Sequence, residues 1–176
     1  MKHKQLFTAG AFLAAFAVAV LVAITNYCTY LLISNEQTAE ILFVAEISDG
    51  EIFSVSYIHS VNNSPVTEYY QIRDTEIYLT ALRFSAFGAG MPTKPEEGQT
   101  MRLDDGDIVI EGFERPITNL CYFIGRTASH TMEWRGGAVP LDGLDEPGQP
   151  VLFSVAAYPR IMLLFKEVSS EWNRTD

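Results

Sequence analysis

Residues 52–73 read IFSVSYIHSVNNSPVTEYYQIR, and this stretch decides the fold class. Apolar and polar side chains alternate on both sides of residues 62–65, NNSP, which are residue types that favour a turn. Alternation with a period of two is typical of a strand with one buried face. The stretch therefore predicts two antiparallel strands, residues 52–60 and 66–73, joined as a hairpin.

Two ionisable side chains of this hairpin, His59 and Glu68, are in phase with hydrophobic residues on their own strands. If the turn is symmetric about Asn63 and Ser64, His59 lies directly opposite Glu68. Such a pair could contact a ligand, transfer a proton or ligate a metal; the alternative is a structural pair that only fixes the strand register. The same register pairs Val55 with Ile72, Tyr57 with Tyr70, and Val61 with Val66.

The remainder of the chain after residue 40 continues this pattern of short β-type runs separated by turn residues. Asp49-Gly50 and Gly136-Gly137 are suited to tight hairpins. We therefore expect an all-β fold, a single antiparallel sandwich or barrel-like domain spanning residues 36–176. The strands expected beyond the hairpin are residues 41–47, 76–84, 107–112, 117–124, 130–135, 151–157 and 160–168.

The N-terminal segment has a different character, because residues 6–33 contain no charged side chain and follow Lys2 and Lys4. This length is sufficient for a transmembrane helix, and the preceding lysines place the N-terminus in the cytoplasm. We expect residues 1–35 to form a cytoplasmic N-terminus and an uncleaved signal anchor, with the C-terminal domain extracytoplasmic or periplasmic. A cleaved signal peptide is the main alternative. A lipoprotein at Cys28 is disfavoured by the bulky Tyr27.

Charge and composition limit the partners. The chain has a formal net charge of −10 and 48% hydrophobic residues, which suffices for a real core and argues against nucleic acid and anionic lipid headgroups as partners. Cys28 and Cys121 are far apart in the sequence, in segments of different character, so no intramolecular disulfide is expected.

Residues 87–99, FGAGMPTKPEEGQ, form the least regular region. Three glycines and two prolines break any strand or helix, which indicates a functional loop or a covering flap, and we expect it to cover or border the main concavity. Gly88 and Gly90 do not form a phosphate cradle, because Pro92 follows and no helix begins there. Close backbone packing or the approach of a ligand fits these glycines better.

His130 is a further candidate, because it shares a strand face with Met132 and Trp134. Together with His59 and Glu68 it could complete a metal or acid–base site, and two histidines with one glutamate would suit zinc. The spacing matches no compact metal motif. The serines at positions 60, 64 and 85 lie in no nucleophile motif, and no cofactor is expected.

The segments YIHSVNNSPVTEYYQI, residues 57–72, and FGAGMP, residues 87–92, resemble the domain-of-unknown-function family 1850, with a resemblance that extends over about residues 41–165. It implies a small extracytoplasmic protein encoded with, or fused to, the permease of TAXI-type tripartite (TRAP) transporters. The implied partners are the transporter permease or its solute-binding protein. No role attaches to the positions that carry the pattern, which are His59, Ser60, Glu68, Gly88, Gly90 and Pro92.

Three functional hypotheses follow. The leading one is a non-enzymatic accessory or binding component of a transporter, held in the cytoplasmic membrane by one helix, with a small molecule as a further candidate ligand. The alternative is a metal-dependent or general acid/base enzyme that uses His59, Glu68 and His130. A purely structural envelope protein is the third. The candidate ligand-binding or structural-polar residues are His59, Ser60, Glu68, Gly88, Gly90, Met91 and His130.

Overall fold

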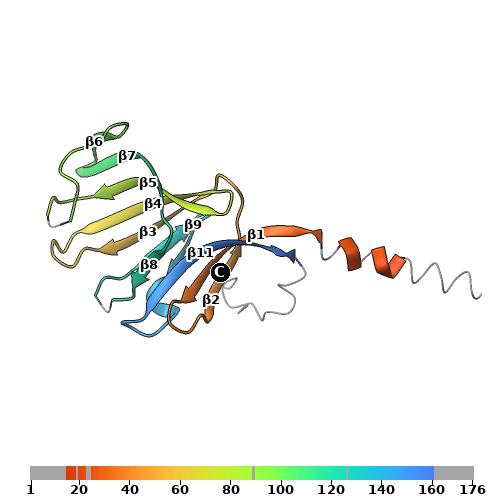
Figure 1. Cartoon of the computed structure of the whole chain (residues 1–176). Coiled ribbons are helices and arrows are strands. Elements are labelled where there is room, and N and C mark those ends of the chain that lie inside the picture. Colours follow the sequence, from red (N-terminus) through yellow and green to blue (C-terminus); the bar gives the residue numbers. More distant parts are fainter. Residues whose placement is uncertain (1–14, 19, 23–24, 89, 126, 161–176) are drawn as a thin grey trace, which may run out of the picture. The chain divides into compact units, whose positions relative to one another are not determined.

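The computed structural model describes residues 15–18, 20–22, 25–88, 90–125 and 127–160 (Figure 1). The chain divides into two compact units. The larger unit comprises Tyr30–Ala156, and the smaller unit comprises the segments that precede and follow it. All the site residues discussed below belong to the larger unit.

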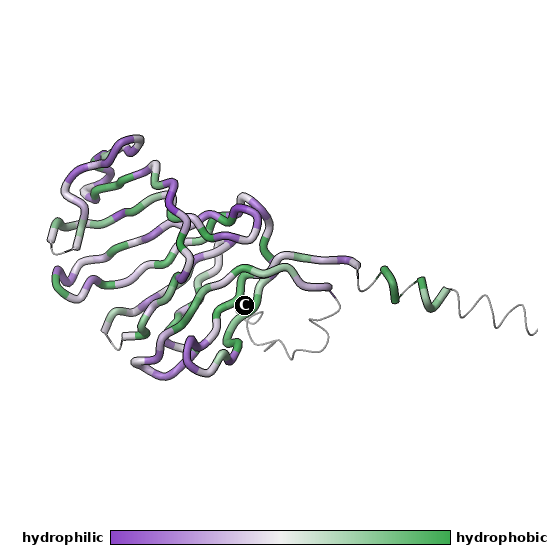
Figure 2. Tube along the Cα trace, viewed as in Figure 1, coloured by the Kyte–Doolittle hydropathy of each residue, from purple (hydrophilic) through white to green (hydrophobic). Residues whose placement is uncertain are grey.

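After a helical stretch that precedes the first strand, the described residues form eleven strands and one short 3-10 helix. Hydrophilic residues gather mainly in the turns between these elements (Figure 2). The elements are β1 (Tyr27–Asn35), β2 (Ile41–Glu46), β3 (Ile52–Ile58), β4 (Pro65–Arg73), β5 (Glu76–Phe84), β6 (Thr100–Asp104), β7 (Asp107–Pro116), β8 (Leu120–Phe123), β9 (Thr131–Trp134), β10 (Gly137–Pro140), η1 (Leu141–Gly143) and β11 (Pro150–Pro159).

The strands form two sheets, one of four strands in the order β2-β1-β11-β8 and one of seven in the order β10-β9-β3-β4-β5-β7-β6. The determined pairings within both sheets are antiparallel. Side chains from both sheets form one core, in which the rings of Phe53 and Phe153 stack with centroids 5.8 Å apart. The all-β antiparallel prediction is confirmed, in the form of two packed sheets rather than one closed sheet.

Residue types with positive φ explain the tight turns. Asp105 and Gly106 join β6 to β7 with φ of 52° and 90°, and Arg135 and Gly136 join β9 to β10 with φ of 50° and 79°. Two successive positive φ values give the turn type whose twist matches antiparallel strands. The second hairpin had been predicted at Gly136-Gly137, one residue later than it occurs.

The prediction of one helix extending to residue 33 is wrong for its last part, because Tyr27–Asn35 forms strand β1. Leu31 and Ile33 are completely buried in the core between the sheets. The uncharged run thus joins two segments, a helical stretch and a strand apolar enough to be buried on both faces. The sequence alone could not separate them, since neither contains a charge.

The helical stretch preceding β1 includes the described residues 15–18, 20–22 and 25. Phe16, Leu21 and Val22 are exposed there. Within the part of the chain that the structure describes, no helix is both long and apolar enough to span a bilayer. Residues 6–14, 19, 23 and 24 of the predicted anchor lie outside that part.

Candidate functional site

A single row of side chains crosses the inner face of the seven-stranded sheet, and Glu68 is its one charged member. Glu68 lies on β4, the middle strand, and its direct neighbours are Val55 on β3 and Leu82 on β5. Because paired residues share a face, the row continues outward on hydrophobic side chains. In strand order the row is Val139, Met132, Val55, Glu68, Leu82, Ile110 and Met101.

The Glu68 carboxylate is held by tyrosines from both sheets. Tyr70, two residues along β4, donates its hydroxyl to Oε2 over 3.0 Å, and Tyr122 on β8 donates to the same oxygen. The two tyrosine hydroxyl oxygens are 2.7 Å apart. Since β8 belongs to the four-stranded sheet, this carboxylate connects the two layers of the sandwich.

His130 packs against two aromatic rings near the same carboxylate. Its ring centroid lies 5.3 Å from that of Tyr57 and 5.5 Å from that of Tyr122. The side chain is only 8% exposed, and its Nδ1 has no hydrogen-bond partner. Its backbone carbonyl accepts a hydrogen bond from Leu141. We call the five residues Tyr57, Glu68, Tyr70, Tyr122 and His130 the Glu68 cluster.

Burial governs the electrostatics of this cluster. It raises the pKa of Tyr57, Tyr70 and Tyr122 well above the usual value, and the nearby Glu68 charge adds to the effect. Burial also lowers the pKa of His130, against a smaller opposing effect of Asp142. The tyrosines therefore remain protonated donors and the imidazole neutral at pH 7. The arrangement can accept hydrogen bonds and attract a cation, but it contains no positively charged group to bind an anion.

The predicted direct opposition of His59 and Glu68 is wrong. Val55 is the residue opposite Glu68, and Val66 lies opposite Tyr57, so the register differs from the prediction by four residues. The loop has the expected length but lies two residues earlier in the chain, because the His59 amide bonds the Ser64 carbonyl over 2.9 Å and residues 60–63 form the turn. An even shift preserves the face of each residue, and Glu68 therefore still faces the core.

His59 instead stabilises the hairpin loop. Its Nδ1 accepts backbone N–H groups of Val61 and Asn62, each over 3.3 Å, and Ser60 is exposed. Across the described ranges, no group of three or more His, Cys, Asp or Glu side chains could hold a metal ion. The expected convergence of His59, Glu68 and His130 at a metal is therefore not found, although Glu68 and His130 both contact Tyr122.

The glycine-containing loop packs directly on this hairpin loop. A Cβ on Gly88 would clash with the side-chain amide of Asn62, so a larger residue here would require Asn62 to move. Gly90 has φ of +83° and no atoms close to its Cβ position. Met91 packs on a second hydrophobic cluster, which lies on β4, β5 and β7 and consists of Val66, Leu82, Phe84 and Ile110. Close backbone packing is thus the role that the structure gives Gly88.

Comparison with known families assigns the chain to one family. The model of a family described as a domain of unknown function, DUF1850, matches residues 53–141, which is half of the chain. The chain belongs to the DUF1850 family. No curated protein and no solved structure matched it. The matched range runs from β3 to η1 and contains every residue of the Glu68 cluster.

Two surface hollows of this DUF1850 chain lie away from the Glu68 cluster. One, of about 350 Å³, is lined by Ser54, Tyr69 and Glu133 among others, and the second, of about 260 Å³, by Ile77, Ile117 and Phe153 among others. Neither has a lining residue from 87–99, so the prediction that this loop covers or borders the main concavity is not supported. Met91 gives the loop a covering role instead.

The tyrosines are the site residues that sequence reasoning missed. Tyr57 and Tyr70 were recognised as sharing the inner face with Glu68, but not as its hydrogen-bonding environment. Their alternation with Glu68 was a usable signal, since a buried carboxylate needs donors. Tyr122 gave no such signal, because it belongs to the other sheet of this DUF1850 fold.

Proposed function

We propose that this DUF1850 chain is a non-enzymatic β domain, anchored in the cytoplasmic membrane and facing away from the cytoplasm, that acts as an accessory component of a TAXI-type TRAP solute transporter. Its partner in this proposal is the transporter permease or solute-binding protein. The observation that carries the proposal is that the two sequence segments resembling such proteins, residues 57–72 and 87–92, meet in the fold through Gly88 and Asn62.

Exposed apolar side chains surround this meeting point and support its use as a binding surface. Val61 is 65% exposed and Phe87 is 53% exposed, and Ile58 at the end of β3 is also exposed. Apolar side chains grouped on the surface of an acidic protein favour contact with another protein. We call Ile58, Val61 and Phe87 the motif surface.

The helical stretch before β1 supports the membrane attachment in this proposal. Its side chains Phe16, Val18 and Leu21 are exposed and apolar, as in a segment that lipid surrounds. The enzyme alternative receives less support, because His59 Nδ1 is engaged by the hairpin loop and Glu68 by tyrosine hydroxyls.

The test is affinity purification of the full chain from native membranes in detergent, with mass spectrometry of the proteins that copurify. A TAXI-type permease or solute-binding protein should copurify with the wild type and be lost with the double variant Val61→Asp and Phe87→Asp. Leu103→Asp is the matched control, because Leu103 is equally apolar and exposed but lies on β6. Absence of any transporter protein, or equal recovery with both variants, would contradict the proposal.

A further inference from the structure

Among the described residues, the Glu68 carboxylate has no basic partner. The ion pairs determined in the described part of the chain engage Arg73, Arg83, Arg102 and Arg135, and none of them involves Glu68. Neutral phenol hydroxyls satisfy hydrogen bonds but do not neutralise the charge. A carboxylate in a largely apolar setting is stabilised further when a cation pairs with it.

The rings around the carboxylate favour the same kind of ligand. The centroids of Tyr57 and Tyr122 lie 6.1 Å apart, and His130 contacts both rings. Aromatic faces attract cations through their quadrupole, and the attraction increases where water is excluded. Anions are disfavoured, because the cluster has no positive group and the whole chain carries a formal charge of −10.

A second, independent observation concerns His130. Its side chain is more than nine-tenths buried, yet Nδ1 has no hydrogen-bond partner. Buried polar atoms are almost always paired, so an unpaired one indicates a missing group. A neutral imidazole offers one acceptor nitrogen, which an N–H donor could satisfy.

We propose that the Glu68 cluster binds a small organic ammonium ion. The ammonium group pairs with the Glu68 carboxylate, donates an N–H to His130, and lies against the faces of Tyr57 and Tyr122. This inference goes beyond the proposed transporter role and does not depend on it, since a ligand titration of the purified chain can succeed or fail whether or not a permease copurifies.

Entry to the site requires a rearrangement, because the three rings contact one another. Glu68 itself is partly exposed, so the carboxylate can be reached from solvent. Separation of the Tyr57 and His130 rings would provide the space for the ammonium group beside it.

The experiment is isothermal titration calorimetry on the full chain in detergent, at constant ionic strength. The probes are propylammonium chloride, sodium butyrate as an anion of similar size, and 1-propanol as a neutral analogue. We expect saturable binding of propylammonium alone. Glu68→Gln should weaken this binding at least tenfold, whereas Glu133→Gln should not change it, because Glu133 is exposed on the outer face of neighbouring β9.

Far-ultraviolet circular dichroism controls for folding of each variant. If Glu68→Gln does not fold, Tyr57→Leu replaces it as the test, since it removes one ring and leaves the hydrogen bonds from Tyr70 and Tyr122 to Glu68. Several-fold weaker propylammonium binding by Tyr57→Leu would support the site. Three results would overturn the proposed site. They are no propylammonium binding to the wild type, unchanged binding by Glu68→Gln (or by Tyr57→Leu where it replaces Glu68→Gln), and equal binding of butyrate or propanol.

Discussion

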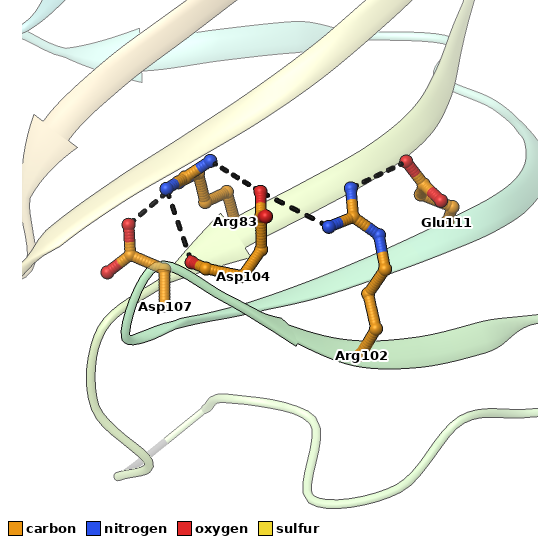
Figure 3. A network of polar contacts seen from close by, with 5 residues as sticks. All are labelled: Arg83, Arg102, Asp104, Asp107 and Glu111. Carbon is orange, nitrogen blue, oxygen red and sulfur yellow. Dashed lines mark hydrogen bonds and ion pairs between the residues drawn. The ribbon is translucent and has the colours of Figure 1, made fainter.

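The carboxylates of the outer face of the seven-stranded sheet and the single carboxylate Glu68 of its inner face are held in different ways. On the outer face of β5, β6 and β7, Arg83 pairs with Asp104 and Asp107, and Arg102 pairs with Asp104 and Glu111 (Figure 3). On the inner face, Glu68 receives tyrosine hydroxyls and, among the residues that the structure describes, no guanidinium. The outer carboxylates thus have charged partners, whereas the inner carboxylate has neutral hydrogen-bond donors.

The contrast shows how environment sets the value of a polar contact. Water screens the outer network, and exposed ion pairs contribute little to stability. The hydrogen bonds of Glu68 lie between two sheets, where a lost partner leaves a buried group unsatisfied. We therefore expect few bonds on the inner face to matter more than many on the outer face.

The largest expected effect is alkaline destabilisation. The pKa values of Tyr57, Tyr70 and Tyr122 are raised in the folded chain, chiefly by burial, so from about pH 10 upward the unfolded state loses these protons first. Below pH 10 both states keep these protons, so the contribution of the three tyrosines to the free energy of unfolding does not change with pH. Above it, each tyrosine lowers that energy by about 1.4 kcal/mol per pH unit until its folded pKa is reached.

Urea unfolding at several pH values measures this slope. Tyr122→Phe should reduce the slope of the free energy of unfolding against pH by the contribution of one tyrosine. The reason is that one proton fewer is released on unfolding. The same slope in Tyr122→Phe and the wild type would show that Tyr122 titrates normally in the folded chain.

Removal of the inner carboxylate comes next. Glu68→Ala should lower the free energy of unfolding by about 2–4 kcal/mol at pH 7, because two hydrogen bonds to a charged group are lost and their donors lie in a partly buried site. Glu111→Ala is the matched outer substitution and should leave the unfolding midpoint almost unchanged. Thermal or urea unfolding compares them, and equal effects would remove the distinction between the faces.

A single hydroxyl should have a smaller effect. Tyr122→Phe should cost about 1–2 kcal/mol at pH 7, since it removes the bond that links β8 to Glu68 across the sheets. Tyr78→Phe is the control, because the Tyr78 hydroxyl bonds Glu76 on the exposed side of β5. That control should unfold like the wild type, and an equal loss in both variants would count against the inter-sheet role.

The smallest expected effect is that of salt on the unfolding midpoint. At 1 M NaCl the screening length falls to about 3 Å, so any effect of Arg102→Gln on the unfolding midpoint should disappear. The effect of Glu68→Ala should persist at the same salt concentration, because its hydrogen bonds are between the sheets. A Glu68→Ala effect that salt abolishes would place that carboxylate in water.

The parts of the fold with a clear period could be predicted from the sequence. Strands β3, β4 and β5 were predicted within two residues, since their side chains alternate between the faces. Strand β1 was missed because it is apolar throughout and continues from an uncharged helical stretch. The short edge strands β6 and β10 were missed because they lack a continuous apolar pattern.

The candidate site was predicted only in part. The alternation of side chains along the strand placed Glu68 on the inner face. That prediction is correct because the register error was an even number of residues. The error itself came from the hairpin loop, since NNSP suits a turn but does not determine which residues lie at its centre. Tyr122 could not be found, because contacts between sheets depend on how the layers pack.

A double-mutant cycle tests the central claim most directly. The claim is that Glu68 links the two sheets through Tyr122. The free energies of unfolding of Glu68→Ala, Tyr122→Phe and the double variant should give a coupling of about 1–2 kcal/mol. The outer cycle of Arg102→Gln with Glu111→Ala should be additive within error. Additive effects of Glu68→Ala and Tyr122→Phe would contradict the account.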